Sequence, residues 1–139
     1  MFTRQEEGRQ EEKAYSEGDR MLKLIGSMTE QYYRDQLIKF NRSLFQDHSM
    51  KRLLGIVQHA FPDMKTAYIL GVTPDQGEDI YTILINSDCI TCIELDRYNL
   101  DTEPIIETVP IKDYKRGLSK IGQIQLAVAM DLAEKRLNH

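Results

Sequence analysis

The side chains of this sequence with the greatest capacity for chemistry are carboxylates between residues 75 and 107. This stretch contains nine acidic residues and one basic residue, Arg97, so its local net charge is −8. Paired carboxylates can act as general acid and base in hydrolases, and they need no fixed spacing in sequence. The same charges can also attract a basic partner and guide it into register. Six acidic residues form the predicted partner-binding set: Asp79, Asp88, Glu94, Asp96, Asp101 and Glu103.

Other roles compete for these carboxylates. Charged side chains along a sheet edge keep it soluble and prevent edge-to-edge pairing, which requires no partner at all. Phosphates would be repelled here, so we expect no nucleic-acid binding. Glu94 and Asp96 lack a glycine-containing, oxygen-rich loop of the EF-hand type around them, so we expect no metal site and no cofactor.

Cys89 and Cys92 stand in the C-x-x-C spacing that occurs in zinc and redox sites. Residues three apart on a strand point to opposite faces, so these thiols are badly placed to bridge or to bind one ion. Zinc would need two further ligands, and the only histidines are His48, His59 and His139. The pattern therefore favours two small apolar strand residues.

Catalytic motifs are absent from the chain. It contains no G-x-S-x-G, P-loop, G-x-G-x-x-G or H-E-x-x-H sequence. We therefore expect a non-catalytic protein-binding module, such as an adaptor, a secretion-type chaperone or a toxin-immunity or inhibitor protein. Its partner would be a protein with a basic or amphipathic segment. The alternative is a small carboxylate-dependent hydrolase or nucleotide-handling enzyme, and a third possibility is a homodimer.

Four apolar, β-branched segments must position the carboxylates: residues 67–72, 80–85, 89–95 and 105–109. The short polar breaks at 73–77 and 86–88 carry turn residues, whereas the join at 96–104 is longer. Short connections favour antiparallel neighbours, so the segments predict a four-stranded antiparallel meander. Within residues 80–85 both alternating sets of side chains are largely apolar. Each face of the sheet therefore needs a helix or a partner to cover it.

Helices are predicted on both sides of these strands. Residues 29–46 carry an apolar stripe of Tyr33, Leu37, Phe40 and Leu44. A second helix is expected to begin with Ser49 as its N-cap and to end before residue 62. After a connector at 109–114, a long C-terminal helix from residue 114 or 118 to 137 has a wide apolar face for the sheet. The fold class is therefore predicted to be α+β.

Residues 1–27 have two explanations. In the first, Gly26 ends one segment and Ser27, with Glu30 three residues later, forms a capping box for the next helix. In the second, Gly26, Ser27 and Met28 are a cloning junction, so that residues 1–27 are a tag or a fused peptide. Residues 28–139 form a single α+β domain under either explanation.

Composition is ordinary for one soluble domain, with 41% hydrophobic and 29% charged residues in 139. No apolar run approaches the roughly 20 residues of a membrane helix, and the first residues are too charged for a secretory signal. We therefore expect a cytoplasmic protein that does not contact membranes. In size, acidity and helix-sheet-helix layout, the chain resembles small bacterial secretion chaperones and toxin-immunity proteins.

Overall fold

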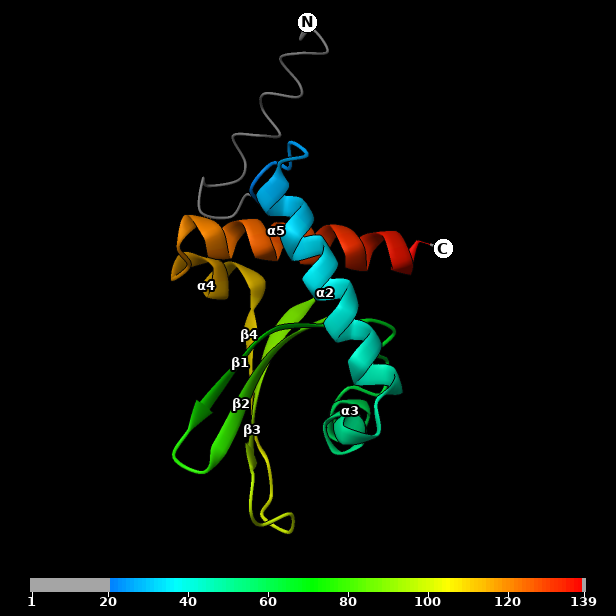
Figure 1. Cartoon of the computed structure of the whole chain (residues 1–139), viewed down its shortest axis with the longest axis vertical. Coiled ribbons are helices and arrows are strands. Elements are labelled where there is room, and N and C mark those ends of the chain that lie inside the picture. Colours follow the sequence, from blue (N-terminus) through cyan, green and yellow to red (C-terminus); the bar gives the residue numbers. More distant parts are fainter. Residues whose placement is uncertain (1–20, 139) are drawn as a thin grey trace, which may run out of the picture.

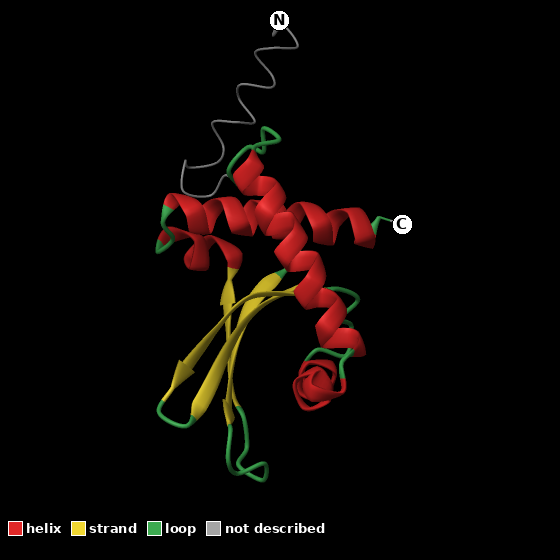
Figure 2. Ribbon diagram, in the orientation of Figure 1, coloured by secondary structure: helices red, strands yellow, loops and turns green. Residues whose placement is uncertain are grey.

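In the computed structural model, residues 21–138 are described. The order of elements is α2 (Met28–Gln46), η2 (His48–Met50), α3 (Lys51–Ala60), β1 (Ala67–Asp75), β2 (Glu78–Ile85), β3 (Cys89–Asp96), β4 (Ile105–Pro110), α4 (Ile111–Arg116) and α5 (Lys120–Leu137). The four strands form one antiparallel sheet in the order β1-β2-β3-β4 (Figures 1 and 2). The predicted α+β fold class and meander are confirmed. Among these residues, no helix has both the length and the apolar character needed to cross a membrane.

The strands match the four predicted segments, and each extends beyond its predicted limits. β1 continues to Asp75 because the turn that follows is confined to Gln76 and Gly77, so the turn predicted at 73–77 was too long. Gly77 has a φ of +82°, which glycine adopts at little cost. Pro74 lies within β1, and the sheet tolerates it because β1 is an edge strand with one neighbour.

Side chains of the sheet alternate between two buried clusters. The first cluster contains Leu84 and packs against α5, and the second contains Ile83 and Ile85 and packs against α3. Leu84 and Ile83 are both fully buried. The prediction that residues 80–85 have apolar neighbours on both faces is therefore confirmed for Ile83, Leu84 and Ile85. Ile80 and Thr82 are only half-buried, since the sheet extends past the helices at this end (Figure 1).

Helix α2 connects the two clusters. It crosses both α5 and β1 (Figure 1), with Leu37 in the first cluster and Leu44 in the second. Phe40, predicted to belong to the same buried stripe, is 45% exposed. The buried position next to it is Asn41, whose Nδ2 donates a hydrogen bond to the Ala67 carbonyl at 2.7 Å. The helix therefore presents a polar side chain where it passes the outer edge of β1.

Two predicted helix boundaries were wrong. Ser49 lies inside η2, and α3 has Met50 at its N-cap position, with no side-chain capping bond. The predicted connector at 109–114 is instead helical from Ile111 as α4. α4 ends at Arg116, and Gly117 follows at its C-cap position. Ser119 then begins α5 as its N-cap, because its Oγ accepts a hydrogen bond from the Gly122 N–H at 3.1 Å. The predicted single C-terminal helix is thus two helices.

The predicted N-cap of α2 is confirmed. Ser27 Oγ accepts a hydrogen bond from the Glu30 N–H at 3.2 Å. The Glu30 carboxylate reaches back to the N–H groups of Ile25 and Gly26, at 3.0 and 2.9 Å, so it fastens the chain before the helix. Met21 and Leu24 pack against the first cluster. Residues 1–20 lie outside the described residues, so the suggestion of a tag or fused peptide stays a prediction.

This fastening gives a pH-dependent prediction. The pKa of the Glu30 carboxyl is lowered, first by the hydrogen bond from the Ile25 N–H. A group with a lowered pKa stabilises the fold above its unfolded pKa, near 4.5, and this contribution is lost as the pH falls through the folded pKa. Glu30→Gln should therefore unfold more easily than wild type at neutral pH, with the difference disappearing under acid conditions.

Urea denaturation at several pH values measures this difference. The matched control is Glu134→Gln, which removes an exposed carboxylate from the last turns of α5. A Glu30→Gln deficit that stays constant from neutral pH to about pH 3 would rule out the ionised carboxylate as its source.

Candidate functional site

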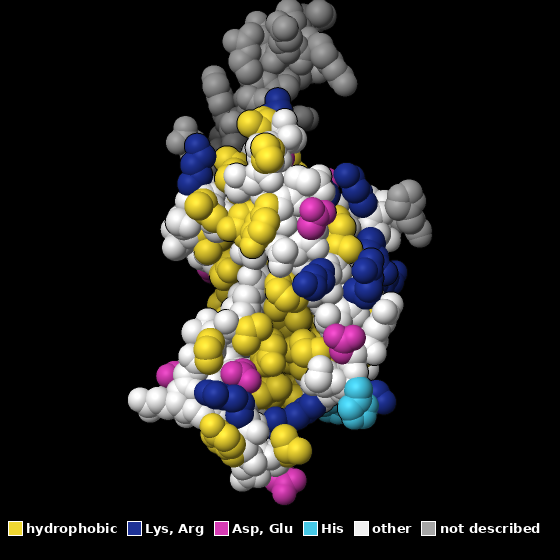
Figure 3. Space-filling view, viewed as in Figure 1, with side chains coloured by type: hydrophobic (Ala, Val, Ile, Leu, Met, Phe, Trp, Pro, Cys, Tyr) yellow, Lys and Arg dark blue, Asp and Glu magenta, His cyan; other side chains and the backbone are white. Residues whose placement is uncertain are grey.

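An apolar groove lies between helix α2 and the sheet. It is a cavity of about 470 Å³ that opens to solvent. Figure 3 shows a recess lined by hydrophobic side chains in the region where Figure 1, in the same orientation, has α2 and α3 on one side and the strands on the other. We define the apolar groove by its lining residues: Phe40, Ser43, Asp47, Ser49, Met50, Ile69, Gly71, Val72 and Tyr81.

The local structure explains why the groove is open. The register of β1 and β2 shifts between Ile69 and Gly71, and beyond this irregularity Val72 stands opposite Tyr81 on the face that α3 covers further along. Gly71 has no side chain to fill the space. Phe40 on α2 and Val72 on β1 remain 45% and 48% exposed at the rim. Large apolar side chains at the mouth of a recess are typical of a surface that receives another molecule.

A second hollow continues the apolar groove toward the end of β3 and the β3–β4 loop. It has a volume of about 300 Å³ and shares Ser49, Met50 and Tyr81 with the first. Its far wall includes Leu100, which is 68% exposed. Burial raises the pKa of the Tyr81 hydroxyl, and the Asp79 charge raises it further, so this side chain stays neutral between the two hollows. The two hollows form one continuous trough across this face of the sheet.

Acidic residues gather where this trough ends, and we call this part of the sheet the acidic end. Asp79 and Asp96 line the second hollow. Asp101 and Glu103 lie in the exposed loop between β3 and β4 that starts beside it. The sequence reasoning therefore predicted four carboxylates that the fold brings to one end of the sheet.

The other two predicted residues lie elsewhere. Asp88 is in the β2–β3 turn, at the opposite end of β3, roughly 25 Å from Asp96 at the usual rise per strand residue. Glu94 pairs in register with Ile80 and Ile105, on the sheet face that α5 covers further along. Neither residue lines the trough among the described residues.

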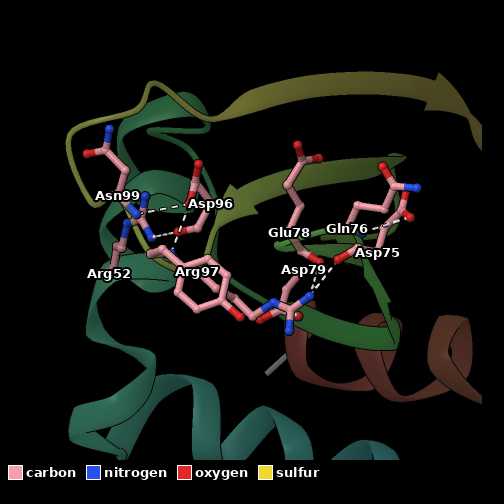
Figure 4. Close-up of polar contacts among 9 residues, drawn as sticks. Arg52, Asp75, Gln76, Glu78, Asp79, Asp96, Arg97 and Asn99 are labelled. Carbon is pink, nitrogen blue, oxygen red and sulfur yellow. Dashed lines mark hydrogen bonds and ion pairs between the residues drawn. The ribbon is translucent and has the colours of Figure 1, made fainter.

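Two arginines occupy the acidic end (Figure 4). Arg97 forms an ion pair with Asp79 at 3.4 Å and also donates to the backbone carbonyls of Asp75 and Glu78. Arg52, on α3, donates to the carbonyls of Asp96 and Leu100. The Arg52 bonds connect α3 to the β3–β4 loop, and the Arg97 bonds connect the end of β3 to the β1–β2 turn. Both arginines line the second hollow together with Asp79 and Asp96. The charge at this end of the sheet is only partly balanced, because six acids lie there against two arginines: Asp75, Glu78, Asp79, Asp96, Asp101 and Glu103.

Asp96 has a structural role of its own. Its Oδ1 accepts hydrogen bonds from the backbone N–H groups of Asn99 and Tyr98, at 2.9 and 2.8 Å, which starts the β3–β4 loop (Figure 4). These bonds hold the pKa of the Asp96 carboxyl below its usual value. A carboxyl with a lowered pKa is a poor general acid at neutral pH.

Comparisons of this chain with known protein families, with curated proteins and with solved structures find no match. Among the described residues, no group of three or more His, Cys, Asp or Glu side chains is arranged to hold a metal ion. Both cysteines are free thiols, and they face opposite sides of β3 as their spacing predicts.

Sequence reasoning missed the trough itself. Phe40 fits an apolar helical stripe equally well whether it is buried or lines a groove. Val72 fits the pattern of an apolar strand in the same way, so neither residue indicates a groove. A usable signal was present in the sheet, because Gly71 interrupts an apolar strand and glycine in a strand often marks a bulge. The trough also depends on the crossing of α2 over β1, which no local pattern specifies.

Proposed function

We propose that this protein is a non-catalytic protein-binding module whose trough binds the apolar side of an amphipathic partner segment. The observation that carries the proposal is the apolar groove, whose exposed rim of Phe40 and Val72 has no described side chain over it. Burying such side chains is the main source of affinity in protein recognition. We propose an adaptor, a secretion-type chaperone or an immunity protein, because each of these acts by binding another protein.

The geometry favours a helix laid in the trough over a strand added to the edge of β1. Asn41 and Gln125 already donate hydrogen bonds to the carbonyls of Ala67 and Leu70, which closes the first half of this edge. The second half contains Pro74 and follows the register shift, and both features discourage strand addition. An amphipathic helix needs only apolar anchors at helical spacing.

The charge at the end of the trough indicates which kind of segment binds and in which direction. The trough ends where six acidic residues of the hairpin ends lie against two arginines, so this end carries an excess of negative charge. A segment with lysine or arginine on its polar face would be steered to this end and held in one direction. The partner is therefore a segment with apolar residues on one side and basic residues on the other.

A labelled model peptide tests this proposal. We would use a helix-forming peptide with leucine at helical spacing and lysine elsewhere, and measure its binding by fluorescence polarisation. Val72→Lys places a charge at the rim and should weaken binding by at least about tenfold. Ile121→Lys is the matched control, because Ile121 is 56% exposed on α5 and does not line the trough.

A second peptide with glutamate in place of lysine tests the contribution of the acidic end. It should bind more weakly than the lysine peptide at low salt, and the difference should shrink as salt is added. Equal binding of the lysine peptide to the wild type and the Val72→Lys variant would refute the trough as the binding site. Equal binding of the two peptides would refute a basic partner.

A further inference from the structure

A third hollow, separate from the trough, lies where α2 crosses the C-terminal half of α5. Its volume is about 260 Å³. Three of its lining residues are basic, namely Arg42 on α2, Lys65 before β1 and Arg136 on α5. No carboxylate belongs to the lining, which is completed by Ile38, Asn41, Phe45 and Gln46. Figure 3 shows Lys and Arg side chains gathered on this side of the molecule.

The three basic side chains have no acidic partner among the described residues. The ion pairs found there join Arg34 and Lys135 to Asp131, Arg97 to Asp79 and Arg116 to Asp113. Segments far apart in the sequence thus bring three positive charges to one hollow without a negative charge to balance them. All three residues are exposed to solvent, and three like charges around one hollow attract an anion.

The guanidinium of Arg136 is held in place by a buried side chain. Its Nη1 donates to the Asn41 Oδ1 at 3.1 Å, and the Asn41 Nδ2 donates in turn to the Ala67 carbonyl at 2.7 Å. Asn41 is only 7% exposed, so its amide is a fixed anchor for the arginine. A guanidinium carries five N–H donors, and one of them is used in this bond. The others remain for a planar or tetrahedral anion.

We propose that this hollow binds a small phosphorylated molecule of about mononucleotide size. A phosphate monoester carries a charge of about −1.5 to −2 at neutral pH, which suits three cations better than a single carboxylate does. The volume of about 260 Å³ is slightly below the roughly 300 Å³ at which small-molecule sites begin, and it is larger than a bare ion needs. Phe45, 37% exposed at the wall, offers an apolar surface to a ring.

Isothermal titration calorimetry with adenosine 5′-monophosphate, adenosine and inorganic phosphate tests the site. We expect the monophosphate to bind most tightly, phosphate more weakly and adenosine weakest. Arg136→Gln and Lys65→Gln should each weaken monophosphate binding by about tenfold, because each removes a charge-assisted hydrogen bond. The matched control is Arg116→Gln, since Arg116 is exposed on α4 outside the hollow and should leave binding unchanged.

Three results would overturn this proposal. The first is the absence of binding by both phosphate and the monophosphate at millimolar concentration and low salt. The second is an equal loss in the Arg136→Gln and Arg116→Gln variants, which would indicate unspecific attraction. The third is a single-stranded oligonucleotide that binds much more tightly than the monophosphate and depends on Arg136, which would make nucleic acid the ligand.

Discussion

Replacing Leu84 or Ile83 with alanine is expected to lower the free energy of unfolding by about 2–5 kcal/mol in each case. Both side chains are fully buried, and they are neighbours in β2 that point into different clusters. Leu84 packs under α5, while Ile83 faces α3 and the end of α2. Each substitution removes apolar contacts and leaves a cavity. Urea denaturation measures the loss of stability, provided that the variant and the wild type have the same m-value.

Ile80→Ala is the matched control for this prediction. Ile80 is in the same strand and on the same face as Leu84, but it lies beyond the helices and is half-buried. Its replacement should cost about 1 kcal/mol, because less apolar surface is lost. A Leu84→Ala variant no less stable than Ile80→Ala would mean that α5 does not cover this face in solution. If Ile83→Ala leaves the free energy of unfolding unchanged, α3 does not cover the opposite face in solution.

Asn41→Leu is expected to lower the free energy of unfolding by about 1–3 kcal/mol. The leucine is similar in size, so it keeps the volume but removes both hydrogen bonds of the amide. The Ala67 carbonyl would then be left without a donor in a buried place, since Ala67 is 0% exposed. A buried acceptor without a partner costs more than the bond itself contributes. Thermal and urea denaturation both measure this change.

The Arg136→Gln variant distinguishes the contributions of the two Asn41 hydrogen bonds to stability, because it removes only the bond from the guanidinium. Arg136 is exposed, and Asn41 lines a hollow that is open to solvent, so water can replace the guanidinium at the Asn41 Oδ1. Replacement of Arg136 should therefore change stability by less than about 0.5 kcal/mol. If it destabilises the fold as much as Asn41→Leu does, the contact with Ala67 is not the important one. A stable Arg136→Gln variant also supports the use of this substitution in the calorimetric test, because any loss of binding then reflects the lost guanidinium.

The two proposed surfaces are independent of each other. The trough lies along the sheet between α2 and α3, whereas the basic hollow lies on another face of α2 beside α5. Their lining residues do not overlap, so a variant of one leaves the other unchanged. Val72→Lys should therefore bind adenosine 5′-monophosphate as wild type does, and Arg136→Gln should bind the lysine peptide normally.

The sequence alone determined the four strands and their pairing. Apolar segments separated by short polar turns were enough to predict the antiparallel meander, because neighbouring strands joined by short turns pair with each other. Apolar side chains on both faces of residues 80–85 predicted that both faces would be covered. The acidic end was also partly predicted, since Asp79, Asp96, Asp101 and Glu103 adjoin turns at one end of the strands.

Only the tertiary structure decided which surfaces are hollow. Phe40 and Asn41 are adjacent in one helix, and hydrophobicity predicts the first to be buried and the second exposed. The structure has the reverse, with exposures of 45% and 7%. The physical reason is the crossing of α2 over the edge of β1, where a backbone carbonyl needs a donor. Such a contact joins residues distant in sequence, Asn41 to Ala67 and Arg136 to Asn41, so no local pattern contains it.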